Sequence, residues 1–239
     1  MLKPKLEPPR HRRRTYLPDI VILLRVALAF VVLGLFSLPF PFPAAALVLT
    51  GVAIALDGLD GYLARRLGVT SDLGAILDIM GDRIVEHVFW IYFAVAGLVP
   101  IWVPLLIVSR SFTVDAIRSV ALVAGKTPFG EHTMQQSPLS RFLVASRTMR
   151  TLYAVAKVSA FLMLGLVVVV ERAEAGGTQL ASQGIVDGLV AVTAWVVYLT
   201  VATCVVRALP VIWDARAFFR HRPPSAPTHR PLPSPEGTG

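Results

Sequence analysis

The sequence predicts an all-α membrane protein with six transmembrane helices and both termini in the cytoplasm. The first observation is composition: 55% of the 239 residues are hydrophobic, 16% are charged, and the mean hydropathy is +0.66. A soluble domain carries about a quarter charged residues, so lipid is the favoured solvent. The second observation is a series of separate apolar runs of membrane-spanning length without period-two alternation, which favours helices over a closed barrel.

The charge balance is basic, with a formal net charge of +8 and a pI of about 10.2. Lysines and arginines flank the apolar runs instead of forming one stripe, which suits anionic lipid and phosphate groups better than a nucleic acid. We therefore expect the lipid bilayer, and no nucleic acid, as a partner. The single cysteine, Cys204, cannot form an internal disulfide and is interpreted as apolar filler.

A basic, proline-broken segment, residues 1–17, opens the chain and has too little apolar content to fold alone. The first predicted helix, Pro18–Ser37, is too long and too charged for a cleavable signal peptide. The other predicted helices are Pro43–Ala64, Leu73–Ala96, Pro100–Ala124, Phe142–Val170 and Gly188–Leu209. We expect residues 18–220 to form one membrane domain, followed by a disordered proline-rich tail at 221–239.

The links between these runs fall into two alternating sets. Pro39–Phe42 and Gly97–Pro100 carry no charge, and the link before the last helix is acidic on balance. The N-terminus, the Arg65–Arg66 turn, the Arg118–Arg150 segment and the C-terminal end are rich in arginine or lysine. The positive-inside rule then places both termini and the Arg65–Arg66 turn in the cytoplasm. The expected location is a bacterial inner membrane.

An acidic block, "DGLDGYLARRLGVTSDLGAILDIMGD", joins the second and third predicted helices. Residues three or four positions apart share a helix face, so Asp57 lies beside Asp60, and Asp78 beside Asp82 on the next helix. Each charge near the bilayer core costs on the order of 3 kcal/mol, and like charges also repel. Cations must compensate such a cluster, and all-oxygen ligands favour Mg²⁺ or Mn²⁺.

Carboxylates that hold divalent ions beside an arginine and the Ser71 hydroxyl suit a phosphate-bearing substrate. Metal ions would neutralise a phosphoryl group, while one carboxylate could take a proton from an alcohol. Gly61 and Gly74 leave room for a ligand to approach the backbone. The alternative is that aspartates at helix ends, such as Asp72, are solvated or capping groups.

This block resembles the signature of the CDP-alcohol phosphotransferase family of membrane enzymes, D-x2-D-G-x2-A-R-x8-G-x3-D-x3-D. Eight fixed positions over 26 residues are all present. The resemblance implies that Asp57, Asp60 and Asp78 bind metal, and that Asp82 completes a second metal site and acts as the catalytic base. It also implies that the CDP portion is held by Gly61, Ala64, Arg65, Ser71 and Gly74.

The reaction implied by the resemblance is attack of an alcohol on the lipid-side phosphorus of CDP-diacylglycerol, with release of CMP. The enzyme would use two metal ions, face the cytoplasm with its active site and form a homodimer. Mg²⁺ and Mn²⁺, and acyl and ether lipids, all remain open from the sequence.

The segment "PLLIVSRSFTVDAIRS" is similar to one in phosphatidylglycerophosphate synthases, which Arg110 and Arg118 match. Ser111 stands where those synthases have glutamate, and Asp115 where they have serine. The segment "SRTMRTLYAVAK" is similar to a second one, in which Arg147 and Arg150 match in type.

These four arginines lie near the predicted cytoplasmic ends of two helices, where an acceptor that carries a phosphate would need forked, charge-assisted donors. Glycerol 3-phosphate is the first choice of acceptor and inositol phosphate the second. The alternative is that Arg118, Arg147 and Arg150 only anchor helix ends at lipid headgroups. The loop at 125–140 is long and polar enough to lie at the membrane surface or to cover the site.

Two rival functions come from other classes. An ion-coupled transporter also uses intramembrane carboxylates, but it predicts paired repeats, which the sequence lacks. A membrane prenyltransferase also uses aspartates and magnesium, but it would show two separated aspartate motifs instead of one block.

Overall fold

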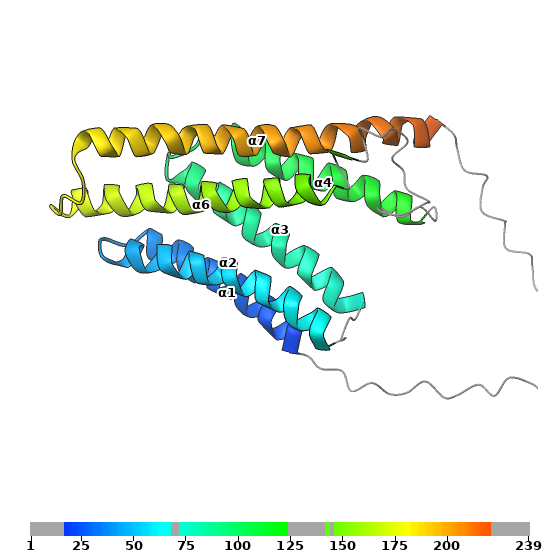
Figure 1. Cartoon of the computed structure of the whole chain (residues 1–239), viewed down its shortest axis with the longest axis horizontal. Helices are drawn as coiled ribbons and strands as arrows, with labels where there is room; N and C mark the ends of the chain where they lie inside the picture. The colour runs from blue at the N-terminus through cyan, green and yellow to red at the C-terminus, as the bar shows by residue number, and fades with distance from the viewer. Residues whose placement is uncertain (1–16, 68–71, 124–141, 144–145, 221–239) are drawn as a thin grey trace, which may run out of the picture.

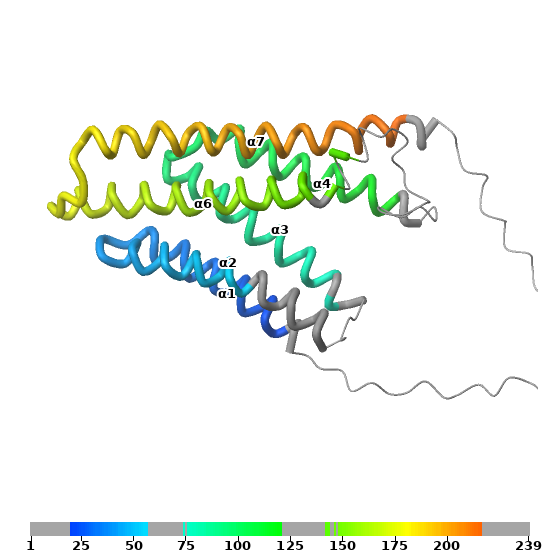
Figure 2. Tube along the Cα trace, in the orientation of Figure 1, coloured from blue at the N-terminus to red at the C-terminus, as the bar shows by residue number. Residues whose placement is uncertain are grey.

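The computed structural model describes the backbone of residues 17–67, 72–123, 142–143 and 146–220. Side chains in these stretches are described except at residues 17–19, 57–67, 72–73, 75, 121–123, 147 and 217–220. The parts not described are grey in Figure 2. In the described part, the chain forms long α-helices and no strand, as the sequence predicts.

The described helices are α1 (Leu17–Phe36), α2 (Phe42–Leu67), α3 (Asp72–Val95), α4 (Trp102–Val123), α6 (Arg147–Ala175) and α7 (Gln183–Arg220). Each predicted run contains one of these helices, and the first four helices match the predicted bounds closely. Helix α6 begins at Arg147 instead of Phe142, after Ser146 in a non-helical backbone conformation with φ −58° and ψ 135°.

Helix α7 is longer than predicted, because it continues through Pro210 to Arg220. Proline removes one backbone donor and usually ends or kinks a helix. Here Ala208 and Val211, on either side of the proline, are both buried in a small cluster with Val114 of α4. Packing on both sides of Pro210 therefore keeps the chain helical where the sequence alone predicts an end.

The helices pack as two antiparallel pairs with α3 crossing between them (Figure 1). Helices α1 and α2 form one pair, and α6 and α7 form the other; α3 contacts α1 and α4, and α4 contacts α7. The start of α1, the end of α2 and the end of α7 lie at one end of the molecule (Figure 1). The turns after α1, α3 and α6 lie at the opposite end, so the helix ends that border the two predicted sets of links lie at opposite ends of the molecule (Figure 1).

The core is apolar and rich in aromatic side chains. Trp90 of α3 is fully buried and meets Phe161 of α6 edge to face, with ring centroids 5.1 Å apart. Phe89 stacks on the same Phe161 ring at 5.1 Å. Phe36 of α1 joins this cluster through Phe93. Aromatic contacts of this kind add to the burial energy and fix α3 between the two helix pairs.

Two glycines allow helices to approach closely. A Cβ atom on Gly81 of α3 would lie 2.8 Å from Cγ2 of Ile22 on α1. A Cβ atom on Gly165 of α6 would lie 2.9 Å from Cζ of Phe36. Both distances are too short for a carbon atom, so only glycine permits these two contacts without a shift.

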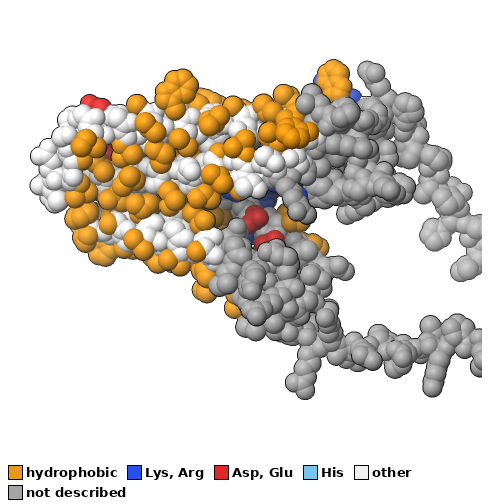
Figure 3. All heavy atoms as spheres, in the orientation of Figure 1, with side chains coloured by type: hydrophobic (Ala, Val, Ile, Leu, Met, Phe, Trp, Pro, Cys, Tyr) orange, Lys and Arg blue, Asp and Glu red, His pale blue; other side chains and the backbone are white. Residues whose placement is uncertain are grey.

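Many apolar side chains lie on the face that Figure 3 shows, and the exposed ones of the described part include Val95, Trp195 and Trp213. In the described part, Thr148–Ala175 and Gln183–Arg216 are long and apolar enough to cross a membrane by length and composition. Ile20–Phe36 and Phe42–Leu56 are shorter apolar helices. Charged residues interrupt the apolar character of α3 and α4. The structure therefore supports a helical membrane protein, and the number of six spans stays a prediction.

Candidate active site

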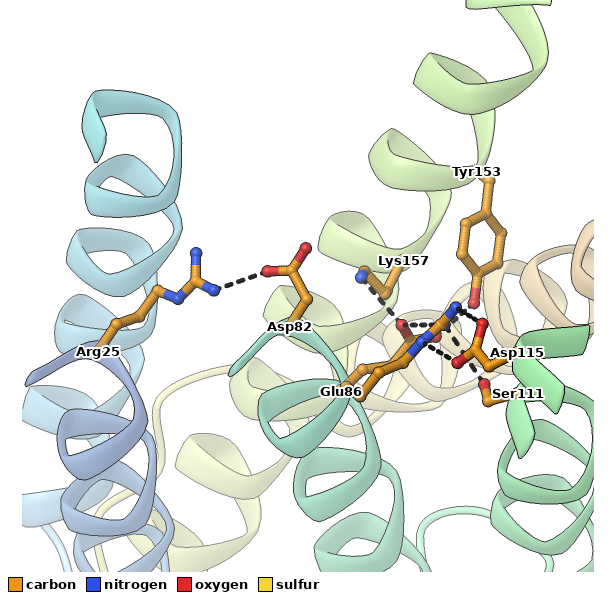
Figure 4. Close-up of polar contacts among 8 residues, drawn as sticks. Arg25, Asp82, Glu86, Ser111, Asp115, Tyr153 and Lys157 are labelled. Carbon is orange, nitrogen blue, oxygen red and sulfur yellow. Dashed lines mark hydrogen bonds and ion pairs between the residues drawn. The ribbon is translucent and has the colours of Figure 1, made fainter. Parts of the chain in front are cut away.

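Asp78 and Asp82 lie one turn apart on α3 and face a single arginine of α1. Arg25 Nη2 donates a hydrogen bond to Asp82 Oδ1 at 2.7 Å and lies 3.9 Å from Asp78 Oδ1. The Arg25 side chain is 3% exposed, whereas both carboxylates are 52% exposed. The two carboxylates thus converge on one buried cation (Figure 4 shows Arg25 and Asp82).

Gly81 makes this contact possible. The missing Cβ of Gly81 would lie 3.4 Å from Arg25 Nη2 as well as close to Ile22, so a larger residue would push α1 away from α3. The sequence places this glycine directly before Asp82. The short separation of the two helices therefore brings the arginine to the predicted base.

Most of the other predicted site residues lie at the end of α2, where the structure describes the backbone only. The last turns of α2 hold Asp57, Asp60, Gly61, Ala64 and Arg65, whose backbone is helical but whose side chains are outside the described residues. Ser71 is outside the description altogether, and Gly74 lies in the first turn of α3.

Among the described residues, no group of three His, Cys, Asp or Glu side chains could hold a metal ion. Two of the four predicted ligands are not part of that search. The metal centre therefore stays a prediction from the sequence.

A second polar cluster lies one turn further along α3, around Glu86. The Glu86 side chain is almost fully buried and accepts hydrogen bonds from the Tyr153 hydroxyl and, at 3.2 Å, from Lys157 Nζ (Figure 4). Tyr153 and Lys157 are one turn apart on α6. A buried carboxylate needs such partners, because an unpaired charge in an apolar interior is strongly unfavourable. This cluster joins α3 to α6.

Arg83 extends the cluster to α4. Its Nε and Nη2 atoms contact the two carboxylate oxygens of Asp115, each at 3.1 Å, and Nη1 donates to Ser111 Oγ at 3.4 Å. The Arg83–Asp115 contact is a bidentate pair, the strongest arrangement of this kind. Sequence reasoning did not select Arg83; its position directly after Asp82 was the available signal.

The predicted acceptor arginines lie near one another. Arg118 is close enough to Arg110 and Asp115 for their charges to interact. Arg207 of α7 interacts electrostatically with Arg110, Arg118 and Arg150, so these four residues gather from three helices. The side chain of Arg147 is outside the described residues.

Arg207 was missed by the sequence analysis, because it lies inside the long apolar run of α7. Its Nη1 atom donates to the Met149 carbonyl at 2.7 Å, and its guanidinium lies 5.6 Å from the centre of the Tyr153 ring. An arginine inside an apolar run was the signal that could have found it. In the described structure, the Nε atoms of Arg110 and Arg207 are buried without a hydrogen-bond partner, which suits an anion-binding role.

Charged side chains of α1, α3, α4, α6 and α7 thus gather within an apolar helical bundle, and Figure 3 shows acidic and basic atoms between the α1–α2 pair and the other helices. This combination defines the class: a helical membrane protein with a site for a charged group. Residues 15–206 match the CDP-alcohol phosphatidyltransferase family, and the chain belongs to this family. The match covers the acidic block and every helix up to the middle of α7, and it favours neither a transporter nor a prenyltransferase.

Three curated relatives illustrate the similarity. The chain is 29% identical over 123 residues to the CDP-diacylglycerol–glycerol-3-phosphate 3-phosphatidyltransferase of Bacillus subtilis (strain 168), covering 46% of this chain and 64% of that protein. It is 34% identical over 119 residues to the enzyme of the same name from Pseudomonas fluorescens, covering 46% and 58%. It is 30% identical over 103 residues to the archaetidylinositol phosphate synthase of Aeropyrum pernix, covering 43% and 53%. The chain therefore spans little more than half the length of these relatives.

Proposed function

We propose that this protein is an integral-membrane transferase of phospholipid biosynthesis, which moves a phosphatidyl group from CDP-diacylglycerol to a phosphorylated small alcohol and releases CMP. The observation that carries the proposal is membership of the CDP-alcohol phosphatidyltransferase family together with a complete signature between Asp57 and Asp82. The apolar exterior supports a bilayer as its environment.

Two half-exposed carboxylates one turn apart, Asp78 and Asp82, support the proposal of a site for a hard divalent cation. Asp78 and Asp82 turn carboxylate oxygens toward the same cation-bearing side chain, and oxygen donors are what Mg²⁺ and Mn²⁺ prefer. We propose that these two residues, with Asp57 and Asp60, hold two such ions. When bound, the ions would neutralise the diphosphate and stabilise the leaving CMP.

Asp82 is proposed as the general base. Its Oδ1 atom accepts the hydrogen bond from Arg25, and the same half-exposed carboxylate offers Oδ2 to the hydroxyl of an incoming alcohol. Arg25 fixes the orientation of the carboxylate while the reaction proceeds. Contacts to the CDP portion are proposed for Gly61, Ala64, Arg65, Ser71 and Gly74.

The acceptor is proposed to carry a phosphate, because several arginines gather beside the polar cluster. Arg207 lies close enough to Arg110, Arg118 and Arg150 for their like positive charges to repel one another. Arg147 lies one turn before Arg150 on α6. A plain alcohol would not require this charge, whereas a phosphate dianion matches forked guanidinium donors.

Glycerol 3-phosphate is the first candidate acceptor, and the names of the Bacillus and Pseudomonas relatives support it. Inositol phosphate is the second, supported by the name of the Aeropyrum relative. We further propose that the site faces the cytoplasm of a bacterial inner membrane and that the protein is a homodimer.

The test uses the full-length protein in lipid nanodiscs with CDP-diacylglycerol, Mg²⁺ or Mn²⁺, and a panel of labelled alcohols. Mass analysis of the lipid product identifies the acceptor, and CMP release reports turnover. We expect a product with glycerol 3-phosphate or inositol phosphate and none with serine or ethanolamine. Transfer only to an unphosphorylated alcohol, or no CMP with any acceptor, would contradict the proposal.

A further inference from the structure

We infer that Asp115 is a specificity-determining residue of the acceptor site, where its carboxylate occupies the guanidinium fork of Arg83 and so competes with the phosphate of the acceptor. The inference rests on the proposed function, in which the acceptor carries a phosphate. It assigns a role to an acidic residue that lies among the arginines of this site.

The geometry of the pair is that of an anion on an arginine fork. Arg83 Nε lies 3.1 Å from Asp115 Oδ2, and Arg83 Nη2 lies 3.1 Å from Asp115 Oδ1. Two parallel N–H···O contacts are the same pattern by which arginine binds a phosphate. Asp115 therefore uses the donors that a bound phosphate would use.

The pair is placed where an acceptor can reach it. The side chain of Arg83 is 24% exposed and that of Asp115 is 37% exposed, so neither is sealed in the core. Arg83 directly follows Asp82, the proposed base, on α3. Asp115 also interacts electrostatically with Arg118, one of the proposed acceptor arginines. A phosphate held by these arginines would lie beside the Asp115 carboxylate.

A phosphate that binds the guanidinium fork of Arg83 must first displace the Asp115 carboxylate, and this displacement opposes phosphate binding. Removing the competing negative charge should tighten binding of a phosphate on the order of tenfold. The effect on an uncharged alcohol should be small, so Asp115 lowers the advantage of phosphorylated over plain acceptors.

The rival explanation is that Asp115 only ties α3 to α4. In that case its removal would lower the thermal midpoint of unfolding without tightening anion binding. Binding of inorganic phosphate, measured calorimetrically in nanodiscs without any CDP-lipid, separates the two explanations. It also separates this inference from the proposed function, since phosphate binding does not require turnover.

The variants are Asp115→Asn, Asp115→Ser and Asp115→Glu, with Asp187→Asn at the start of α7 as the matched control. We expect Asn and Ser to lower the phosphate Kd about tenfold and to lower the KM for glycerol 3-phosphate. We expect Glu, which keeps the charge, and the Asp187 control to leave the Kd close to that of the wild type.

Arg83→Gln tests whether Asp115 changes the phosphate Kd through the guanidinium group of Arg83. Because Asp115 acts through Arg83, the gain from Asp115→Asn should largely disappear in the Arg83→Gln background. The inference is overturned by a phosphate Kd that is unchanged or higher in both Asp115→Asn and Asp115→Ser. It is equally overturned by the same gain with and without Arg83, or by an absence of phosphate binding in every variant.

Discussion

Arg25 of α1 donates a hydrogen bond to Asp82 of α3 across 2.7 Å, although the two residues are 57 positions apart in the chain. The arginine is buried and the aspartate is half exposed, so Arg25 contacts the carboxylate from the interior of the protein. This contact ties the first helix to the residue proposed as the base. The proposed chemistry therefore depends on how α1 and α3 pack.

Replacing Arg25 by Met removes the guanidinium group but keeps much of the side-chain volume. We expect kcat for CMP release to fall at least about tenfold, because the orientation of Asp82 would no longer be fixed by a charged hydrogen bond. Arg25→Lys keeps the charge without the fork and should retain more activity than Arg25→Met. Equal, wild-type turnover in both variants would show that this contact plays no part in catalysis.

Gly81→Ala should destabilise the protein by about 1–3 kcal/mol, because the added Cβ would lie 2.8 Å from Ile22 Cγ2. Gly34→Ala is the matched control, since nothing lies within 4 Å of its Cβ position on α1. The thermal midpoint in detergent reports both changes. Ile22→Ala combined with Gly81→Ala should recover part of the loss, and failure of any recovery would argue against this contact.

Glu86→Ala should destabilise the protein by roughly 3 kcal/mol or more, because it leaves Lys157 without its buried carboxylate. Glu174→Ala, at an exposed position near the end of α6, is the control and should change stability little. The double variant Glu86→Gln with Lys157→Met removes both charges together. It should be more stable than Glu86→Ala; a lower thermal midpoint would contradict the view that charge pairing is the main role of Glu86.

Arg110→Ala should raise the KM for the phosphorylated acceptor at least about tenfold, because it removes one charged donor from the arginine group. Arg172→Ala is the control, since this arginine lies in the last turn of α6, away from the α4 arginines along the chain. Steady-state kinetics with glycerol 3-phosphate and with inositol phosphate measure both. An unchanged KM for each acceptor would remove Arg110 from the site.

Most of the fold could be predicted from the sequence, because long apolar runs separated by charged or proline-containing links define helices in a bilayer. The end of α7 could not, since the packing of Val211 against α4 outweighs the local effect of Pro210. The start of α6 was also misplaced, because Phe142 continues the apolar pattern although the helix begins at Arg147.

The site was predictable only in part. Spacing alone indicates that Asp78 and Asp82 share a face of α3. It does not say which residues of other helices lie opposite them, because that depends on the rotation and approach of the packed helices. The contacts of Arg25 with Asp82 and of Lys157 with Glu86 therefore appear only in the structure. Helix spacing could have grouped Arg83 with Glu86, but not with Asp115 on α4.

The most direct test of the account is CMP release from CDP-diacylglycerol by the purified full-length protein with glycerol 3-phosphate or inositol phosphate. The variants Asp57→Asn and Asp82→Asn are compared with Asp187→Asn, which lies at the opposite end of the molecule. The account predicts turnover in the wild type and in the Asp187 control, and none in the other two, although all four proteins remain folded. Undiminished CMP release by Asp82→Asn would contradict it.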